Sequence, residues 1–397
     1  MSRPFFLLLA VAAAITTTKG ATELVLPPYL DAYGYSLELI GALASLVAVV
    51  QLGSRLPVGL AYRAEQAKRQ FALALVAFGV SVVGLGLARG DPAAIVALSA
   101  LHGLAFGSVT TLGLALIIDL TGGKRAGRSM AWYTAANSLG YALGALGGGA
   151  VADRAGLAPT LAVVGWLPFA AALALRLLPA LEGAPLPTER GAGVRGVLGA
   201  IRDLDPRVWV AFVIVVYINV IADSVDTFFP VYAPAVGIPL ATVGLLRAFK
   251  SGAAIFIRST GPLFLGAVDH RVVTVVAIVA SAAATAALPL STSTLVLIAI
   301  FIVLGLTRGV LRATSAAQIA EIRGEGRDVG LASGVYNSGL DLGTIVGPLV
   351  GGVIAGALGI PAMFQIVAAA SLAAWLAVQL ATMRARARAR SGQMSYL

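Results

Sequence analysis

Residues 295–316 read LVLIAIFIVLGLTRGVLRATSA. No residue from Leu295 to Thr307 carries a charge, and two arginines, Arg308 and Arg312, then stand one helical turn apart. Apolar blocks of this kind predict helices that cross a membrane, and a charge at bilayer depth is costly unless it faces a cavity or a partner. The arginines therefore predict that other spans surround this one.

The rest of the chain is equally apolar. Of its 397 residues, 59% are hydrophobic and 12% are charged, whereas soluble domains carry roughly 25% charged residues. We therefore expect an integral membrane protein with little chain left for a soluble domain. The absence of Cys excludes disulfides and thiol chemistry, and with only two His residues we expect no metal site and no cofactor.

Apolar blocks bounded by charges and turn residues predict twelve membrane-spanning helices. They lie at about 5–30, 37–60, 71–88, 93–119, 130–152, 157–178, 208–232, 240–265, 272–289, 294–320, 329–354 and 361–382.

Basic residues orient these spans, because cytoplasmic loops are enriched in Lys and Arg. With the N-terminus inside, only Arg89 and Arg154 of the loop cations fall outside. We therefore expect both termini in the cytoplasm, in the inner (plasma) membrane of a bacterium, with the basic tail against anionic lipid. The net charge of +10 is then a topology signal, and we expect no nucleic-acid partner. The cytoplasmic set includes Arg63, Lys68, Arg69, Lys124, Arg125, Arg128, Arg190, Arg195, Arg202, Arg207, Arg384, Arg386, Arg388 and Arg390.

The longest polar stretch, residues 179–207, divides the spans into six and six. We expect a first bundle at 1–178, a cytoplasmic linker at 179–207, a second bundle at 208–383 and a basic tail at 384–397. A shift of 203 residues aligns distinctive residues of the two halves, and paired six-helix halves with a site between them are typical of transporters. The pairs include Glu23 with Asp226, Pro27 with Pro230, Tyr29 with Tyr232, Gly34 with Gly237, Arg55 with Arg258, Lys68 with Arg271, and Tyr133 with Tyr336.

This pattern resembles the major facilitator superfamily over nearly the whole chain. The superfamily's loop signature, roughly G-x-L-A-D-R-x-G-R-R, is partly retained in GLAYRAEQAKR, where Tyr62 replaces the Asp. In the second half, GAVDHR retains Asp269. The fifth span, NSLGYALGALGGG, is similar to the antiporter motif of drug–proton exporters, although their span-four Arg is replaced here by His102 in SALHGLAFG. The resemblance implies an all-α fold of two pseudo-symmetric six-helix bundles that rock about a central cavity.

Glycines recur every four residues in two of the predicted spans. Small residues at this spacing let helix backbones approach closely. The resemblance places these spans where the halves meet, so we interpret the glycines as gating positions, with static packing as the alternative. They are Gly140, Gly144 and Gly148 in one span and Gly339, Gly343, Gly347 and Gly351 in the other.

Ionisable residues also lie at membrane depth, most of them in the second half. The repeat-related positions of Arg308, Arg312, Arg247 and Lys250 are Ala105, Val109, Ala44 and Val47, and Asp341 corresponds to Ser138. A charge network confined to one half indicates specialisation for a solute or a proton. Arg55 and Arg258 fall near the cytoplasmic ends, where we expect them to snorkel.

Two interpretations of the opening arginines remain. Both could be neutralised by Asp341 in a structural lock, or one could pair with Asp341 while the other lines the solute pathway. We expect the second arrangement, in which either arginine can be the partner of Asp341. Lys19 precedes Glu23 by four residues, which predicts a helical ion pair, and His102 is either a proton relay or a satisfied buried residue.

No enzyme signature competes, and the sequence predicts a secondary transporter, coupled to protons, that exports a small organic compound. Uptake of an organic anion is the runner-up, followed by lipid or lysolipid translocation on the same fold. We expect a monomer that binds its solute, protons and membrane lipid, the solute carrying an anionic or zwitterionic group. The proton-coupling candidates are Glu23, Asp223, Asp226 and Asp341. The solute-binding candidates are Arg308, Arg312, Arg247, Lys250, Lys19, Asn137 and Asn337.

Overall fold

The structure is a computed structural model that describes residues 3–121, 126–178, 206–264, 270–324 and 329–394, and every regular element in these ranges is helical. The predicted linker therefore lies almost entirely outside the described residues, as do Lys124, Arg125 and Asp269. The first group of helices comprises α1 (Arg3–Ala32), α2 (Leu37–Leu60), η1 (Ala64–Gln66), α3 (Ala67–Leu87), α4 (Pro92–Thr121), α5 (Ala126–Ala155), α6 (Leu157–Val164), α7 (Trp166–Ala174) and η2 (Leu175–Leu177). The second comprises α9 (Pro206–Ala235), α10 (Leu240–Phe264), α11 (His270–Ala287), η4 (Leu288–Leu290), α12 (Thr294–Gly324), α13 (Val329–Leu358) and α14 (Ile360–Met394).

These helices confirm the predicted all-α membrane fold. Within the described ranges, eleven segments are long and apolar enough to cross a membrane. The remaining predicted span, 130–152, is the 30-residue helix α5, whose many glycines lower its hydropathy. The span predicted at 157–178 is interrupted at Gly165, where α6 ends and α7 begins. Pro168 in the first turn of α7 has no backbone N–H to donate, so it fits a helix start.

Short turns join the helices at the end of the molecule opposite residue 178. Gly34, between α1 and α2, has φ = 81°, and its repeat counterpart Gly237, between α9 and α10, has φ = 80°. Side chains with a Cβ rarely adopt this left-handed conformation, which explains a glycine at both positions. We call this the far end. The opposite end, which carries Arg63, Lys68, Arg69, Arg176 and Arg207, is the basic end.

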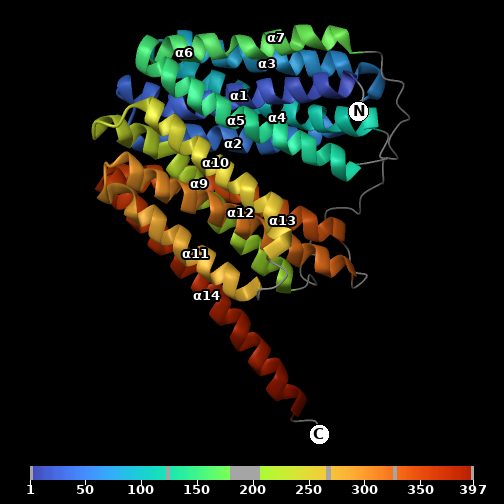
Figure 1. Ribbon diagram of the computed structural model, residues 1–397, viewed down its shortest axis with the longest axis vertical. Helices are drawn as coiled ribbons and strands as arrows, with labels where there is room; N and C mark the ends of the chain where they lie inside the picture. Colours follow the sequence, from blue (N-terminus) through green and yellow to red (C-terminus); the bar gives the residue numbers. More distant parts are fainter. Residues whose placement is uncertain (1–2, 122–125, 179–205, 265–269, 325–328, 395–397) are drawn as a thin grey trace.

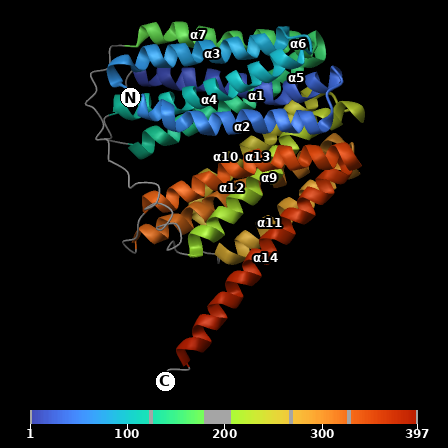
Figure 2. The same ribbon diagram turned by 180° about the vertical axis from the view of Figure 1, so that it is seen from behind.

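The two groups of helices form two bundles that lie side by side (Figure 1). Within the first, α1 packs against α5, and within the second, α9 packs against α13. Two helix pairs make most of the contact between the bundles, α2 with α13 and α5 with α10, and α1 also contacts α9. The same arrangement is seen from behind in Figure 2, where α14 extends beyond the rest of the second bundle.

The glycines that recur every four residues lie inside the bundles, which corrects their assignment to the contact between halves. A Cβ on Gly144 would meet the backbone of Thr17 and Ala21 on α1, and Gly140 and Gly148 face the same helix. In the second bundle, Gly339, Gly343, Gly347 and Gly351 face α9 in the same way. These glycines therefore set the close approach of α1 to α5 and of α9 to α13. These contacts agree with the alternative interpretation of the glycines, which is static helix packing.

A second set of small residues lies between the bundles, on different faces of the same helices. Gly41 of α2 meets the backbone at Pro348 and Gly352 of α13. Its repeat counterpart, Gly244 of α10, meets α5 at Ala145 and Leu146. The two contacts between bundles are thus related by the 203-residue repeat, and both lie towards the far end.

Two polar contacts reinforce this junction at the far end. The Ser45 hydroxyl donates to the Ile345 carbonyl at 2.7 Å. The Asp153 carboxylate of α5 accepts from the backbone N–H groups of Leu240 at 3.0 Å and Ala241 at 2.8 Å. It therefore caps the N-terminus of α10 from the other bundle, a position where a negative charge is favourable.

Towards the basic end, the bundles separate. A Cβ on Gly53 of α2 or Gly334 of α13 would meet nothing within 4 Å, whereas a Cβ on Gly41 or Gly352 of the same two helices would meet backbone atoms within 3 Å. The ribbons of the two bundles diverge in the same direction in Figure 1. The bundles are therefore joined most closely at the far end, and their helices diverge towards the basic end.

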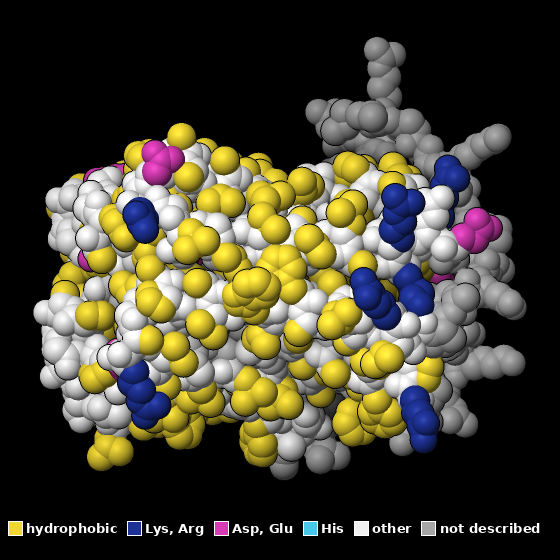
Figure 3. Space-filling view, turned by 90° about the horizontal axis from the view of Figure 1, so that it is seen from above, with side chains coloured by type: hydrophobic (Ala, Val, Ile, Leu, Met, Phe, Trp, Pro, Cys, Tyr) yellow, Lys and Arg dark blue, Asp and Glu magenta, His cyan; other side chains and the backbone are white. Residues whose placement is uncertain are grey.

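The outer face of the first bundle matches a membrane environment. Hydrophobic side chains cover the middle of this face, and Lys and Arg side chains gather towards its two ends, more of them at one end (Figure 3). Exposed apolar residues such as Leu73, Val76, Leu173 and Leu177 contribute to this cover. An apolar belt between charged ends is the pattern expected of a surface in contact with lipid.

Candidate functional site

Asp226 is the centre of a buried charge cluster in the second bundle. The Lys250 ammonium of α10 donates to its Oδ1, and the Arg247 guanidinium, on the same helix, donates to its backbone carbonyl and lies with Nε 3.5 Å from Oδ1. Arg308 of α12 approaches the other carboxylate oxygen, with Nη1 4.0 Å from Oδ2. Lys250 and Arg247 are only 6% and 7% exposed, so the carboxylate compensates cations that have little access to water.

The cluster retains polar atoms with no hydrogen-bond partner among the described residues. They are Nε of Arg308, Nε of Arg312 and Oδ2 of Asp223. Asp223 precedes Asp226 by one helical turn, and its polar neighbour is Thr344 of α13. Buried polar atoms are usually paired, so three unpaired atoms around one cluster indicate a place built to receive a further charged or polar group. We call Asp223, Asp226, Arg247, Lys250, Arg308 and Arg312 the midplane cluster.

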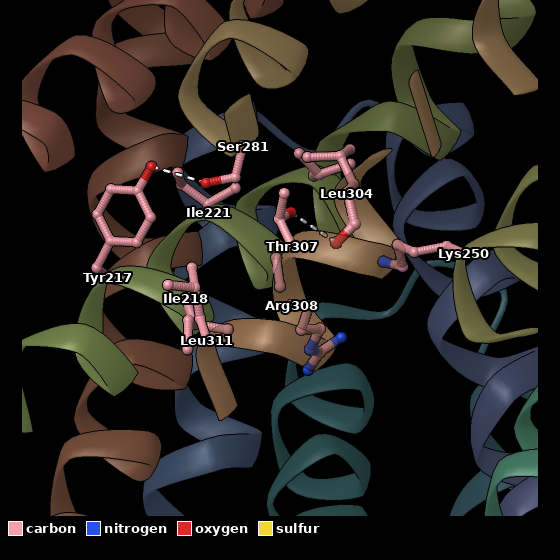
Figure 4. Close-up of a pocket in the computed structure, with 11 residues that line it drawn as sticks. Tyr217, Ile218, Ile221, Lys250, Ser281, Leu304, Thr307, Arg308 and Leu311 are labelled. Carbon is pink, nitrogen blue, oxygen red and sulfur yellow. Dashed lines mark hydrogen bonds between the residues drawn. The ribbon is translucent and has the colours of Figure 1, made fainter. Parts of the chain in front are cut away.

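A small pocket inside the second bundle ends at this cluster (Figure 4). Its volume is about 20 Å³, which is space for one small group. Apolar side chains of α9 and α12 form most of the wall, and Lys250 and Arg308 also line the pocket. The Tyr217 hydroxyl contributes polarity to the lining by donating to the Ile278 carbonyl at 2.7 Å, and it lies 2.9 Å from the Ser281 hydroxyl.

The first bundle carries a separate polar chain. The Lys19 Nζ lies 3.3 Å from the Glu23 carboxylate, which confirms the predicted helical ion pair. The same ammonium lies 3.4 Å from Nε2 of His102, and Nδ1 of His102 lies 3.4 Å from the Ser81 hydroxyl. The Ser81 hydroxyl donates to the Phe78 carbonyl at 2.7 Å. Glu23, with 40% of its side chain exposed, is the accessible end of this chain, and His102 is 1% exposed.

Asp341 pairs with Arg55, not with Arg308 or Arg312 as predicted. Nη1 of Arg55 lies 2.8 Å from Oδ1 and 2.9 Å from Oδ2 of Asp341. The physical reason is that α13 packs between α9 and α2, whereas α12 packs mainly on α10, α11 and α9. Asp341 therefore faces the other bundle. Arg55, expected to snorkel, instead forms an ion pair between the bundles.

The remaining solute-binding candidates, Asn137 and Asn337, lie in the halves of α5 and α13 nearer the basic end. Asn137, half-buried beside Tyr133, stands one turn before Tyr141 on α5. Asn337 is exposed, one turn before Asp341 on α13.

Tyr141 is a candidate that the sequence reasoning missed. Its phenol is within electrostatic range of Glu23 in its own bundle and of Asp223, Asp226 and Arg308 in the other. The repeat contained a signal, because a shift of 203 residues aligns Tyr141 with Thr344, the neighbour of Asp223.

Comparisons with known proteins agree with this geometry. A family model described as Major Facilitator Superfamily matches residues 5–290 and 261–393. The fold is similar to the crystal structure of the nucleoside transporter NupG, with a TM-score of 0.78, 14% identity, and coverage of 96% of this chain and 99% of that one. It is also similar to a bacterial homologue of the human lysosomal transporter Spinster in an inward-facing and unoccupied conformation, with a TM-score of 0.73, 14% identity and 96% of both chains covered. A sequence search of curated proteins finds no match.

Proposed function

Because this chain belongs to the Major Facilitator Superfamily, a family of transporters that are generally not enzymes, we propose that it is a proton-coupled secondary transporter for a small organic solute with an anionic group. The proposal rests on the midplane cluster, where three cations lie within 4.0 Å of Asp226 and a fourth, Arg312, follows Arg308 by one turn of α12. Solute and proton would bind between the bundles, which expose this site to one side of the membrane at a time.

The excess of cations supports an anionic solute. Asp226 balances part of the charge of Arg247, Lys250 and Arg308, and Arg312 adds a further cation whose Nε has no hydrogen-bond partner among the described residues. A guanidinium presents several donors in a planar fork that fits a carboxylate or phosphate. The anionic group of the solute would therefore bind at Arg308 and Arg312.

Asp223 is the candidate that best fits the proton site. Among the candidate carboxylates, Asp226, Asp341 and Glu23 have cations within 4.0 Å, whereas one oxygen of Asp223 has no hydrogen-bond partner in the described chain. A buried carboxylate without such a partner is most easily accommodated when it carries a proton. Loss of that proton would attract Arg308 towards Asp223 and away from Asp226, so the proton and the solute anion would act on the same guanidinium.

The direction of transport is a separate part of the proposal. The glycine-rich α5 was the reason to favour export, but its glycines pack against α1, and α13 packs against α9 in the same way. The cation excess favours an organic anion irrespective of direction. If the basic end faces the cytoplasm of a bacterial inner membrane, the separation of the bundles at that end corresponds to an inward-open state.

We propose that the transporting unit is the monomer, since each chain contains both bundles.

The test uses purified protein in proteoliposomes. Counterflow of a panel of radiolabelled organic anions, zwitterions, cations and nucleosides would identify the solute class, and we expect exchange of an anion or zwitterion. Imposed pH gradients of either sign would then show the coupling and its direction. Arg308→Gln should abolish exchange, whereas Asp223→Asn should permit exchange but abolish accumulation driven by a pH gradient.

Arg89→Gln at the far end provides the matched control, because it removes one arginine away from the midplane cluster. Exchange confined to cations or neutral solutes would contradict the proposed solute class. Uphill transport that survives Asp223→Asn unchanged would remove Asp223 from the coupling mechanism.

A further inference from the structure

A second recessed surface lies on the outer side of the first bundle, away from the midplane cluster. It is a groove between α3 and the α7–η2 segment, with a cavity volume of about 600 Å³. Its lining residues are Lys68, Arg69, Ala72, Val76, Phe169, Ala172, Leu173, Leu175 and Arg176. Both helices belong to the layer of the molecule farthest from the second bundle (Figure 1). We call this surface the α3–α7 groove.

The lining is divided by polarity along the helix axis. The three basic residues, Lys68, Arg69 and Arg176, all lie at the basic end of the two helices. The wall beyond them is apolar as far as Val76, which is about 12 Å farther along α3 at 1.5 Å per residue. Leu173 on the opposite wall is 60% exposed. The groove therefore combines a positive entrance with an open, apolar strip at membrane depth.

The described residues do not neutralise the charges at the entrance. Among the described residues, no carboxylate lies within ion-pair distance of Lys68, Arg69 or Arg176. Arg69 and Arg176 are exposed, whereas Lys68 is half-buried and donates to the carbonyl of Leu178 at the end of η2. Lys68 thus fixes the turn that holds the entrance, and two guanidinium groups remain available for an anion.

We propose that the α3–α7 groove is a binding site for one anionic phospholipid, with the headgroup phosphate on Arg69 and Arg176 and an acyl chain along Ala72, Val76 and Leu173. The argument is charge complementarity at the interface together with an apolar strip below it, which is the polarity of a phospholipid from headgroup to tail. Basic residues near a membrane surface attract anionic lipids. The site is independent of the proposed transport function, because it lies on the outer face of one bundle.

The test measures lipid binding by the full chain. Purified protein would be titrated with phosphatidylglycerol, with phosphatidylcholine of the same acyl chains and with inorganic phosphate. Binding would be followed by native mass spectrometry and by the midpoint of thermal unfolding. We expect tight binding of one phosphatidylglycerol, much weaker binding of phosphatidylcholine and no stabilisation by inorganic phosphate.

The variant Arg69→Gln/Arg176→Gln removes both free guanidinium groups and leaves Lys68 in place. We expect it to lose roughly 30-fold in affinity for phosphatidylglycerol, since each basic residue near a membrane surface contributes about fivefold. Arg3→Gln/Arg63→Gln removes the same charge at the same end outside the groove and should bind as the parent does. Ala72→Phe fills the apolar strip without changing the charge, and it should also weaken binding.

Two outcomes would overturn the site. One is equal binding of phosphatidylglycerol by the parent, the double variant and Ala72→Phe. Another is stabilisation by inorganic phosphate that matches the lipid, which would assign the arginines to a soluble anion. Solute exchange that remains normal in the double variant keeps this result separate from the transport proposal.

Discussion

At the scale of the residue, the charge balance of the second bundle depends on Asp226. Its carboxylate accepts from Lys250 and lies 3.5 Å from Arg247 and 4.0 Å from Arg308. Removing one member of a buried ionic group typically costs about 3–5 kcal/mol, because the remaining charges are left uncompensated. Removing the Asp226 carboxylate should therefore cost more stability than removing any one of the three cations around it.

We predict that Asp226→Asn lowers the free energy of unfolding by about 3 kcal/mol. Adding Lys250→Gln should restore part of this loss, because it removes one of the uncompensated cations. The measurement is thermal or denaturant unfolding of the purified single and double variants. Glu65→Gln, at an exposed carboxylate outside the membrane-spanning helices, serves as the control and should cost less than about 1 kcal/mol. Equal stability of Asp226→Asn and the parent would show that the cluster does not hold the fold.

His102 is a second residue whose role follows from its contacts. It is fully buried and lies between Lys19 and Ser81. We predict that His102→Leu destabilises the protein by about 1–3 kcal/mol, because the Lys19 ammonium loses a buried acceptor. His102→Gln, which can still accept a hydrogen bond, should recover part of the loss. If the two variants unfold alike, the contact with Lys19 contributes little.

Tyr62 shows how a departure from the superfamily's loop signature is accommodated. It stands where the signature has an Asp, and its hydroxyl donates to the Asp119 carboxylate at the end of α4. Burial and this carboxylate raise the pKa of Tyr62, so the phenol stays protonated and remains a donor over the physiological range. The loop thus keeps an acidic group nearby, supplied by a different helix.

At the scale of the element, the distinction between the two sets of glycines decides what each helix can do. Gly144 lies on the face of α5 that packs closely against α1 within one bundle. Gly147, three residues later, lies on another face, where a Cβ would meet no atom within 4 Å. The same helix therefore has one face that tolerates a side chain and one that does not.

We predict that Gly144→Ala destabilises the protein by about 1–3 kcal/mol, the usual cost of overpacking a close contact. Gly147→Ala should be neutral or stabilising by up to about 1 kcal/mol, because alanine favours a helix over glycine. Thermal unfolding of the two variants in the same detergent is the measurement. The opposite order of stability would contradict the assignment of the glycine faces.

The helices themselves could be predicted from the sequence because a membrane span needs a long apolar block, and such blocks are visible without any knowledge of packing. The membership of the midplane cluster was also accessible, because Asp226, Arg247, Lys250 and Arg308 are charged at a depth where charges are costly. Pairing was not. Asp341 and Arg312 lie at similar depths, but which face of α13 meets α2 depends on the packing of the whole bundle, and so does the electrostatic proximity of Tyr141 to charges of both bundles.

At the scale of the whole molecule, alternating access requires the far end to open. In this structure it is held by the repeat-related contacts of Gly41 and Gly244 and by the Asp153 cap on α10. The chain contains no Cys, so pairs of cysteines can be introduced without a background.

We predict that a disulfide between Asp153→Cys and Ala241→Cys, where the Asp153 side chain contacts the other bundle at the far end, abolishes transport. A reducing agent should restore it. A disulfide between Thr274→Cys and Thr314→Cys, whose hydroxyl groups lie 3.3 Å apart within the second bundle, should leave transport unchanged. Counterflow in proteoliposomes before and after reduction gives the comparison. Full transport by the far-end crosslinked protein would show that the far end does not open during the cycle.

The confinement of the midplane cations to one bundle has an electrical consequence. With Asp223 protonated, the cluster of two carboxylates and four cations carries a net charge of about +3, and the bundles that hold it would change their exposure to each aqueous side during the cycle. Moving one elementary charge across the membrane potential is worth about 2.3 kcal/mol per 100 mV. A bound solute anion would cancel part of this charge, so the empty return step, more than the loaded step, would respond to voltage.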